Sequence, residues 1–315
     1  GAVVGLYAAG PSLGVPERTA INVSAEARSI DAGTPGRDRV GRLRFLGGVR
    51  LASDHKSFGG ISALLWEPEC RRLLAVTDAG NWLVLAPLEA GGRLTGVEAA
   101  WLAPLLDDAG RPATRKRLAD AEALSRDPAS GDTIVWFEGE HRGQRYAGVS
   151  ACRPESLARA SAEILRPDAI RSWPLNGGIE AAVHTPDGLI LFSEEATDGP
   201  GRRQVVRIPG TPTSYPAAED FVATDAADAG TAGLLVLSRR FSPERGVAAI
   251  LFQATATGQG FEFRELARFR RPLLVDNMEG LAVRQEAGRT IVYLASDNNF
   301  NPLQETLLMK FELLP

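Results

Sequence analysis

The chain has 315 residues, a formal net charge of −4 and a composition that is 44% hydrophobic and 23% charged. These values are ordinary for a globular protein and exclude a disordered, coiled-coil or collagen-like chain. No block of like charges occurs, so we expect no nucleic-acid partner. No run of about 18 apolar residues is present, so we expect no transmembrane segment. None of the lysines follows a glycine, which excludes a Walker A loop.

The two cysteines and the first ten residues bear on the compartment of the protein. Cys70 and Cys152 are the two cysteines, and no C-x-x-C motif occurs. A single bridge between them is possible, but we favour two buried free thiols. The chain begins GAVVGLYAAG, which fits either a mature chain after signal-peptide removal or a boundary unrelated to processing. We expect a periplasmic or secreted protein, with a flexible N-terminal segment over residues 1–19 and a single domain over 20–315.

A repeat organises the chain from residue 58 onward. Each copy has a small or acidic start, a short strand, a turn, and a more apolar strand that ends in polar residues. The five copies begin at Phe58, Asp120, Gly177, Asp225 and Asn277. The strand starts, compared at Ile61, Glu122, Glu180, Asp228 and Glu279, recur at the spacing of propeller blades, about 40–50 residues, with some longer loops.

The repeat predicts an all-β fold, a β-propeller. Residues 20–57 contain the strand patterns INVSAEARSI and VGRLRFLGGVRLAS, which we expect to complete a sixth blade. We also expect the N- and C-terminal strands to close the ring, because closure removes open sheet edges. A β-sandwich, the competing fold, does not predict a repeat of one motif. Residues 154–165 alone have a helical pattern, which we interpret as an insertion.

Acidic residues recur where a hairpin would start and end. Glu122, Glu180 and Glu279 stand at strand starts. Because a hairpin returns the chain to its starting level, they should share one face of the ring with the residues at strand exits. Those residues are Asp78, Glu138, Glu140, Glu194, Glu195, Asp297 and Asn298, with Arg239 and Arg240. These acids could instead cap loop N–H groups or pair with arginines, but a repeat does not need glutamate to fold.

The predicted acidic face suggests a metal-binding and catalytic site. Carboxylate and amide oxygens without thiols or paired histidines favour Ca²⁺ over Zn²⁺. The expected metal ligands are Glu122, Glu180 and Glu279, completed by Asn277, Asp297 and Asn298. The expected catalytic residues are His55, His141, Glu138 and Glu194, and the expected substrate-binding residues are Lys56, Arg239 and Arg240. Histidines would act as acid or base, and the cations would hold an anionic group.

Six strings, in order, closely resemble the family known as the esterase-like activity of phytase, or phytase-like, domain. They are FGGISAL (58–64), DAEAL (120–124), NGGIEA (176–181), LLVLSRRF (234–241), DNMEGLAV (276–283) and SDNNFNPLQETLLMKFEL (296–313). The likeness runs from about residue 43 to the C-terminus. It implies a β-propeller, common in exported bacterial proteins, with hydrolysis of esters or phosphoesters as the activity.

We therefore expect an exported, Ca²⁺-dependent hydrolase acting on a small anionic or ester substrate. Two alternatives remain open. One is a non-catalytic propeller that binds a ligand or a protein partner, with calcium tying the blades together. The other is a lactonase, because calcium-dependent lactonase propellers use a glutamate in a strand start similar to Glu279-Gly280, an analogy of fold alone.

Overall fold

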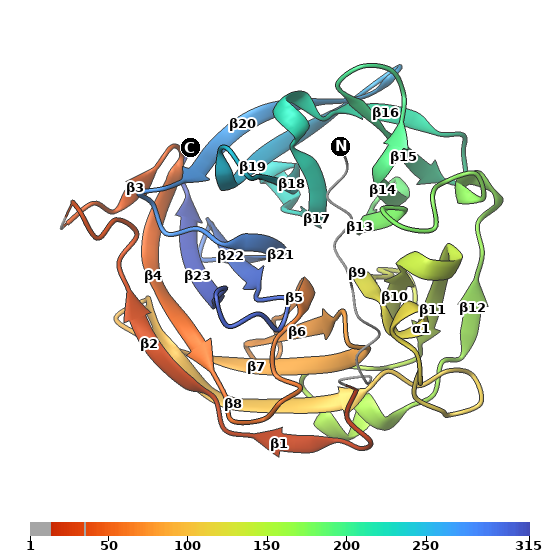
Figure 1. Cartoon of the computed structure of the whole chain (residues 1–315), viewed down its shortest axis with the longest axis horizontal. Helices are drawn as coiled ribbons and strands as arrows, with labels where there is room; N and C mark the ends of the chain where they lie inside the picture. Colours follow the sequence, from red (N-terminus) through yellow and green to blue (C-terminus); the bar gives the residue numbers. More distant parts are fainter. Residues whose placement is uncertain (1–13, 35) are drawn as a thin grey trace.

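The computed structural model describes residues 14–34 and 36–315, which form antiparallel sheets around a central axis (Figure 1). Residues 1–13, most of the predicted N-terminal segment, lie outside the described residues. Within the described part, no helix has the length and apolar character needed to cross a membrane.

Five four-stranded units, which we number as blades 1 to 5, account for nearly all strands. Blade 1 contains β5 (Ile61–Glu67), β6 (Arg72–Thr77), β7 (Asn81–Ala90) and β8 (Arg93–Pro104). Blade 2 contains β9 (Ala121–Arg126), β10 (Thr133–Phe137), β11 (Arg142–Tyr146) and β12 (Glu163–Leu165). Blade 3 contains β13 (Ile179–Thr185), β14 (Gly188–Thr197), β15 (Arg202–Ile208) and β16 (Thr213–Pro216).

Blade 4 contains β17 (Val222–Asp228), β18 (Leu234–Ser242), β19 (Gly246–Thr257) and β20 (Gly260–Arg270). Blade 5 contains β21 (Asn277–Glu286), β22 (Arg289–Asp297), β23 (Thr306–Leu313) and β4 (Leu43–Ala52). Outside these units, β1 (Thr19–Ile21) pairs with β8, while β2 (Ser24–Arg28) and β3 (Arg39–Val40) pair with β4. The helical elements are α1 (Lys116–Ala119) and the 3-10 turns Glu138–Glu140, Pro154–Ala158, Asp168–Ile170, Ala218–Asp220 and Gly230–Ala232.

The innermost strands form a ring. β5, β9, β13, β17 and β21 contact one another in that cyclic order and surround the centre of the molecule (Figure 1). The outer strands of blades 3 and 4 are joined by a single parallel bridge, between Ser214 and Gly260. This radial arrangement is that of a β-propeller.

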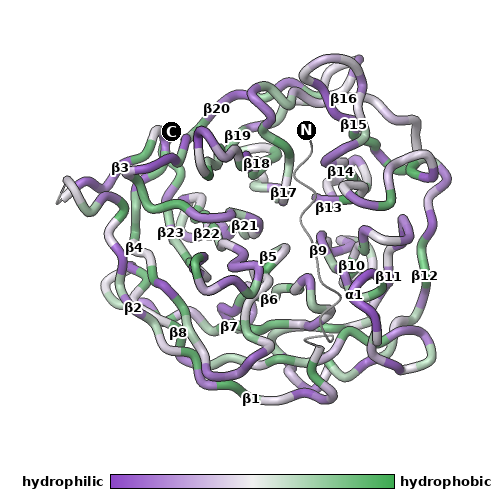
Figure 2. Tube along the Cα trace, in the orientation of Figure 1, coloured by the Kyte–Doolittle hydropathy of each residue, from purple (hydrophilic) through white to green (hydrophobic). Residues whose placement is uncertain are grey.

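Apolar clusters fill the junctions between neighbouring blades. In β6, for example, Leu73 packs into the cluster shared with blade 5, and the next residue, Leu74, packs into the cluster shared with blade 2. Because successive side chains of a strand point to opposite faces, a strand covered on both faces must be apolar along its length. Figure 2 shows hydrophobic stretches in green along the strands, interrupted by hydrophilic stretches in purple, as on the outer strand β20.

The ring is closed by its two terminal strands, as predicted: β4 pairs antiparallel with β23. The expected sixth blade is wrong. The strands of residues 20–57 take outer places on existing sheets instead, because β4 supplies the fourth strand of blade 5 and β1 and β2 extend blades 1 and 5. The predicted helix over 154–165 is also wrong. This segment is a 3-10 turn over Pro154–Ala158 followed by β12.

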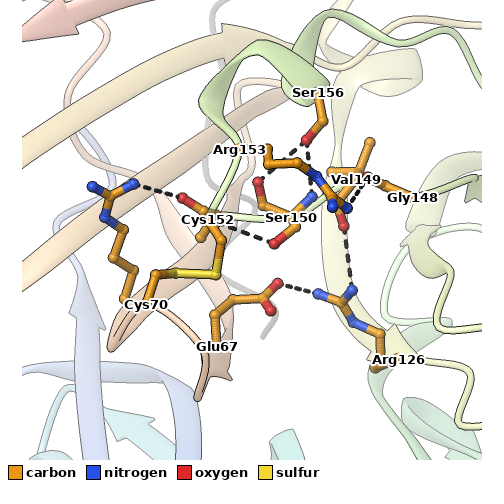
Figure 3. Close-up of a disulfide and its surroundings, with 11 residues drawn as sticks. Glu67, Cys70, Arg126, Gly148, Val149, Ser150, Cys152, Arg153 and Ser156 are labelled. Atoms are coloured by element: carbon orange, nitrogen blue, oxygen red, sulfur yellow. Dashed lines mark hydrogen bonds and ion pairs between the residues drawn. A yellow bond between two sulfur atoms is a disulfide. The ribbon is translucent and has the colours of Figure 1, made fainter.

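A disulfide links Cys70 and Cys152, whose Cα atoms are 5.4 Å apart, so the preference for two free thiols is wrong. Cys70 lies in the β5–β6 turn of blade 1, and Cys152 lies after β11 in blade 2. Glu67 forms an ion pair with Arg126 across the same junction (Figure 3). The bridge therefore joins adjacent blades on one side of the ring. The start of β5 lies on the other side.

Asp225 of β17 ties three innermost strands together. Its Oδ2 accepts hydrogen bonds from the N–H groups of Leu64 in β5, at 3.1 Å, and Leu281 in β21, at 2.7 Å. Its Oδ1 accepts the N–H of Ala226 at 2.9 Å. An innermost strand has no sheet neighbour on its axial side, so its N–H groups there need another acceptor. Burial raises the pKa of Asp225 well above its usual range even with these donors.

Replacing Asp225 should cost more stability than its single side chain suggests. Asp225→Ala leaves buried N–H groups of two other blades without acceptors, at about 1–3 kcal/mol each. We expect a loss of about 3–5 kcal/mol in the free energy of unfolding, measured by urea denaturation. Asp228→Ala, an exposed carboxylate on the same strand, is the control and should change it by less than about 1 kcal/mol. Equal losses would contradict the role of Asp225.

Removing the disulfide should destabilise the fold without changing the site. A bridge that closes a long loop contributes about 2–4 kcal/mol, largely by restricting the unfolded chain. We expect Cys70→Ala/Cys152→Ala to lower the free energy of unfolding by that amount in non-reducing buffer. Dithiothreitol should lower the stability of the wild type to that of the variant and leave the variant unchanged. A wild type insensitive to reductant would contradict this expectation.

Candidate functional site at the axial end of the innermost strands

A β-bulge occurs at the same place in all five innermost strands. In each, pairing with the second strand skips one residue: Ser62, Glu122, Glu180, Thr224 and Glu279. The predicted recurrence of the three glutamates at one register is therefore present. The structural equivalents in blades 1 and 4 are Ser62 and Thr224, whereas the sequence comparison used Ile61 and Asp228, which lie at other registers.

The second strand of each blade adds a residue at the same level. In each innermost strand, the residue just before the bulge pairs with a residue of the second strand. The next residue along the second strand is Asp78, Glu138, Glu194, Arg239 or Asp297 in blades 1 to 5. Four of these five are acidic. Together with Asp120, which precedes β9, the acidic residues of the bulges and of these second-strand positions form what we call the acidic cluster: Asp78, Asp120, Glu122, Glu138, Glu180, Glu194, Glu279 and Asp297.

Glycine at the start of blade 1 permits the close approach of these groups. Gly60 has φ = +65°, and a Cβ atom there would collide with Oδ1 of Asp78. Gly177 in blade 3 stands in the same way against Glu195. The Gly-Gly pairs that begin both repeats are thus explained by backbone conformation and space.

Burial and mutual repulsion raise the pKa values of the cluster. Burial raises the pKa of Glu122 well above its usual range, and the charge of Glu180 raises it further. The pKa of Glu180 is raised in the same way by burial and then by Glu194. Burial also raises the pKa of Glu138 and of Glu279 to about 7. Without a further cation, these carboxyl groups therefore take up protons more readily than ordinary glutamates.

Two cations lie within the cluster. The Nε of Arg239 is 2.8 Å from Oε1 of Glu279, and its Nη2 is 3.7 Å from Oε1 of Glu194. Lys116, on α1, places Nζ 3.1 Å from Oδ2 of Asp78 and 3.2 Å from Oδ1 of Asp120. Sequence reasoning identified Arg239 but missed Lys116, because no strand pattern connects α1 to the axis. Its one signal was a position four residues before Asp120.

One part of the cluster could hold a metal ion. Carboxylate oxygens of Asp120, Glu122 and Glu138 all lie within 4.8 Å of one another. Glu138 also accepts the backbone N–H of Gly177 through Oε1, which orients that carboxylate. Oxygen donors at this separation suit a hard divalent cation. Asp120 was not among the predicted ligands, although it is the first residue of the DAEAL string.

Three further predicted ligands, Asn277, Asp297 and Asn298, belong to blade 5. Asn277 donates from Nδ2 to Oε1 of Glu279 at 2.8 Å, so its amide supports that glutamate. Burial and the charge of Asp78 raise the pKa of Asp297 well above its usual range. The side-chain oxygen of Asn298 accepts the N–H of Gly60 at 3.1 Å, which joins blade 5 to the start of blade 1.

The two predicted histidines lie in loops near the starts of blades 1 and 3. His141 places Nε2 2.8 Å from the carbonyl oxygen of Pro174, close to the Gly178 that precedes β13. Nε2 must carry the proton in this bond, so Nδ1 is left as an acceptor in the neutral ring. His55 accepts the N–H of Ser57 through Nδ1, which leaves its Nε2 as the donor.

Arg240 and Lys56 are not brought to the cluster. Arg240 follows Arg239 on a strand and so points to the other face. Its Nη1 lies 3.3 Å from Oε2 of Glu219, and its guanidinium stacks 4.8 Å from the ring centre of Phe221. Lys56 is exposed and makes no ion pair with the described residues. The double arginine therefore does not form a two-pronged clamp in this arrangement.

Comparison with known proteins identifies a family by sequence. The family described as esterase-like activity of phytase (Phytase-like) matches residues 56–300. No curated protein matches the chain in sequence. Among solved structures, hydrazine synthase from Kuenenia stuttgartiensis is similar at 10% identity and a TM-score of 0.36, covering 78% of this chain and 58% of that one. This TM-score is too low to support a structural argument, so the fold rests on the strand pairing.

With metal ions removed, the stability of the protein should fall as pH rises. Folded Glu138 and Glu279 have a pKa of about 7, whereas an unfolded glutamate titrates near about 4.3. Between these values the native state binds more protons than the unfolded state, so the free energy of unfolding decreases with pH. In EDTA we expect urea denaturation to give a value about 5 kcal/mol lower at pH 8 than at pH 5, since each of the two glutamates contributes about 2.5 kcal/mol.

The matched variant is Glu279→Gln, which cannot take up this proton. Its free energy of unfolding should depend less steeply on pH over the same interval. A wild type whose stability rises from pH 5 to pH 8 in EDTA would contradict the raised pKa values.

Proposed function

The chain belongs to the Phytase-like family, described as esterase-like activity of phytase, and on this premise we propose that it hydrolyses ester or phosphoester bonds at the acidic cluster, with Ca²⁺ bound there. The observation that carries the proposal is the charge of the site. Eight carboxylates gather at one level of the axis, and the ion pairs of Arg239 and Lys116 reach only some of them. A buried excess of like charge is costly unless a cation is bound.

The donor set fits calcium. The three grouped carboxylates, Asp120, Glu122 and Glu138, would supply oxygen ligands, and both cysteines are joined in the disulfide, so neither offers a thiolate. We propose Glu180, Glu279 and Asp297 as further carboxylate ligands, with Asn277 and Asn298 as amide support; the charges of Glu180 and Glu279 already act on Glu122. Calcium bound there would supply a positive charge that polarises an ester oxygen and lowers the pKa of a nearby water.

The protein's own residues would orient the substrate and handle protons. Arg239 presents a guanidinium that Glu279 and Glu194 hold in place, and it would bind the anionic or carbonyl portion of the ester. Lys116 takes the place proposed for Lys56 on sequence grounds, because its Nζ is already at the cluster. Glu138, predicted from sequence to exchange protons, is proposed here as a metal ligand. Glu194 remains the carboxylate proposed to exchange protons. His141, through its Nδ1, and His55, through its Nε2, are proposed to relay them.

We also propose that the protein is exported, to the periplasm or beyond the cell. The Cys70–Cys152 disulfide supports this proposal, since disulfides form and persist in oxidising compartments.

The first test is calcium binding by calorimetry. We expect Glu122→Gln/Glu180→Gln/Glu279→Gln to lose affinity by about 100-fold or more, beyond the effect of changing groups that only support metal ligands. The matched control is Glu69→Gln/Glu98→Gln/Glu262→Gln, which removes the same charge from exposed positions away from the axis. It should bind calcium as the wild type does. Absence of binding in the wild type would overturn the metal proposal.

The second arm is hydrolysis of p-nitrophenyl esters and p-nitrophenyl phosphate, with and without EDTA. We expect turnover of at least one class that EDTA abolishes and calcium restores. Calcium binding without any turnover would instead favour the non-catalytic alternative, a propeller in which the ion ties the blades together. Turnover that EDTA leaves unchanged would support hydrolysis and contradict its dependence on a metal ion.

A further inference from the structure

A cleft of about 740 Å³ opens beside Arg239 and Asn277. Its walls are the end of the β18–β19 hairpin, the segment 271–277 that leads into β21, and the loop 299–304 between β22 and β23. Arg239 and Asn277 both contact Glu279 of the acidic cluster. The cleft is therefore continuous with the site proposed above and is large enough for a small organic molecule.

The cleft carries the most exposed apolar side chains of the described residues. Leu303 is 89% exposed and Phe241 is 66% exposed, and both line the cleft. Val247 and Val275 line it as well. Large apolar side chains left in water on two different segments that line a cleft, next to a polar centre, indicate a surface that contacts an apolar ligand group.

The charges of the cleft argue against a polyanion. Its charged lining consists of Arg239, Arg271 and Asp276. Arg239 is already opposed by Glu279 and Glu194, and the carboxylate of Asp276 lies in the same lining as Arg271. Behind Arg239 lies the rest of the acidic cluster. A molecule with several phosphate groups would thus find one lining cation, Arg271, that forms no ion pair with the described residues, whereas an uncharged or singly charged ester needs no further cation.

We propose that this cleft binds the apolar acyl or aryl part of the substrate, so that the protein acts on uncharged or singly charged esters with a sizeable apolar group rather than on polyphosphates. The ester bond would lie toward Arg239, and the apolar group would lie between Phe241 and Leu303. The proposal rests on the hydrolase function proposed above, and it names the substrate class of that site.

The activity test compares p-nitrophenyl octanoate with p-nitrophenyl acetate. We expect the wild type to prefer octanoate by about 100-fold in kcat/KM, because each buried methylene adds to transition-state binding. Phe241→Ser/Leu303→Ser should reduce this ratio by at least tenfold. The matched control is Leu88→Ser/Ile164→Ser, which removes two exposed apolar side chains that lie outside the cleft and should keep the ratio. Thermal unfolding checks that both variants are folded.

A binding test does not depend on turnover. Dansyl-undecanoate, a singly charged apolar probe, should increase in fluorescence on binding to the wild type and to the control variant, and should bind at least tenfold more weakly to Phe241→Ser/Leu303→Ser. Inositol hexakisphosphate should not displace it at equal concentration. If no ester is hydrolysed, the proposed function fails while this test still decides the cleft. Equal probe affinity in both variants, or displacement by the polyphosphate, overturns the substrate class and leaves the hydrolase proposal standing.

Discussion

The backbone of five innermost strands must satisfy its hydrogen bonds without a sheet neighbour on the axial side, and this constraint organises the molecule. Asp225 meets it by accepting N–H groups from β5 and β21 while it belongs to β17. Thr224, the bulged residue before it, donates to the carbonyl of Met278 in β21 at 3.0 Å. Three of the five blades are thereby held at fixed heights along the axis, and the bulges above Asp225 are brought to one level.

The concentration of charge follows from that alignment. Because the bulged residues and the second-strand residues beside them share a level, the bulge glutamates of blades 2, 3 and 5 lie close together. Burial then raises the pKa values of Glu122 and Glu180 well above their usual range. A fold selected for stability alone would gain from apolar residues at these positions. The retained carboxylates, one guanidinium and one ammonium instead make a polar centre, while the disulfide reinforces the opposite ends of the strands in blades 1 and 2.

Much of the site could be predicted from local pattern, and the errors have specific causes. Glu122, Glu180 and Glu279 were found because each stands in a well-formed hairpin, where register is a local property. The sequence comparison places blade 4 at the wrong register. The bulge of this blade carries Thr224 in place of a glutamate, and Asp228 is the acidic residue that the comparison uses instead. Lys116 was missed because its approach to Asp78 depends on a loop that connects two blades, and no periodicity describes such a loop.

By itself the sequence determined the first hairpin of each blade, the family and the register of the three glutamates, because hairpins form between neighbouring segments with matching patterns. Only the tertiary structure decided the number of blades, the pairing of Cys70 with Cys152 and the separation of Arg239 from Arg240. Those features depend on how distant segments meet when the ring closes. The strand β4 could have begun a new blade or completed an old one with the same sequence, and its pairing with β23 made the ring close at five.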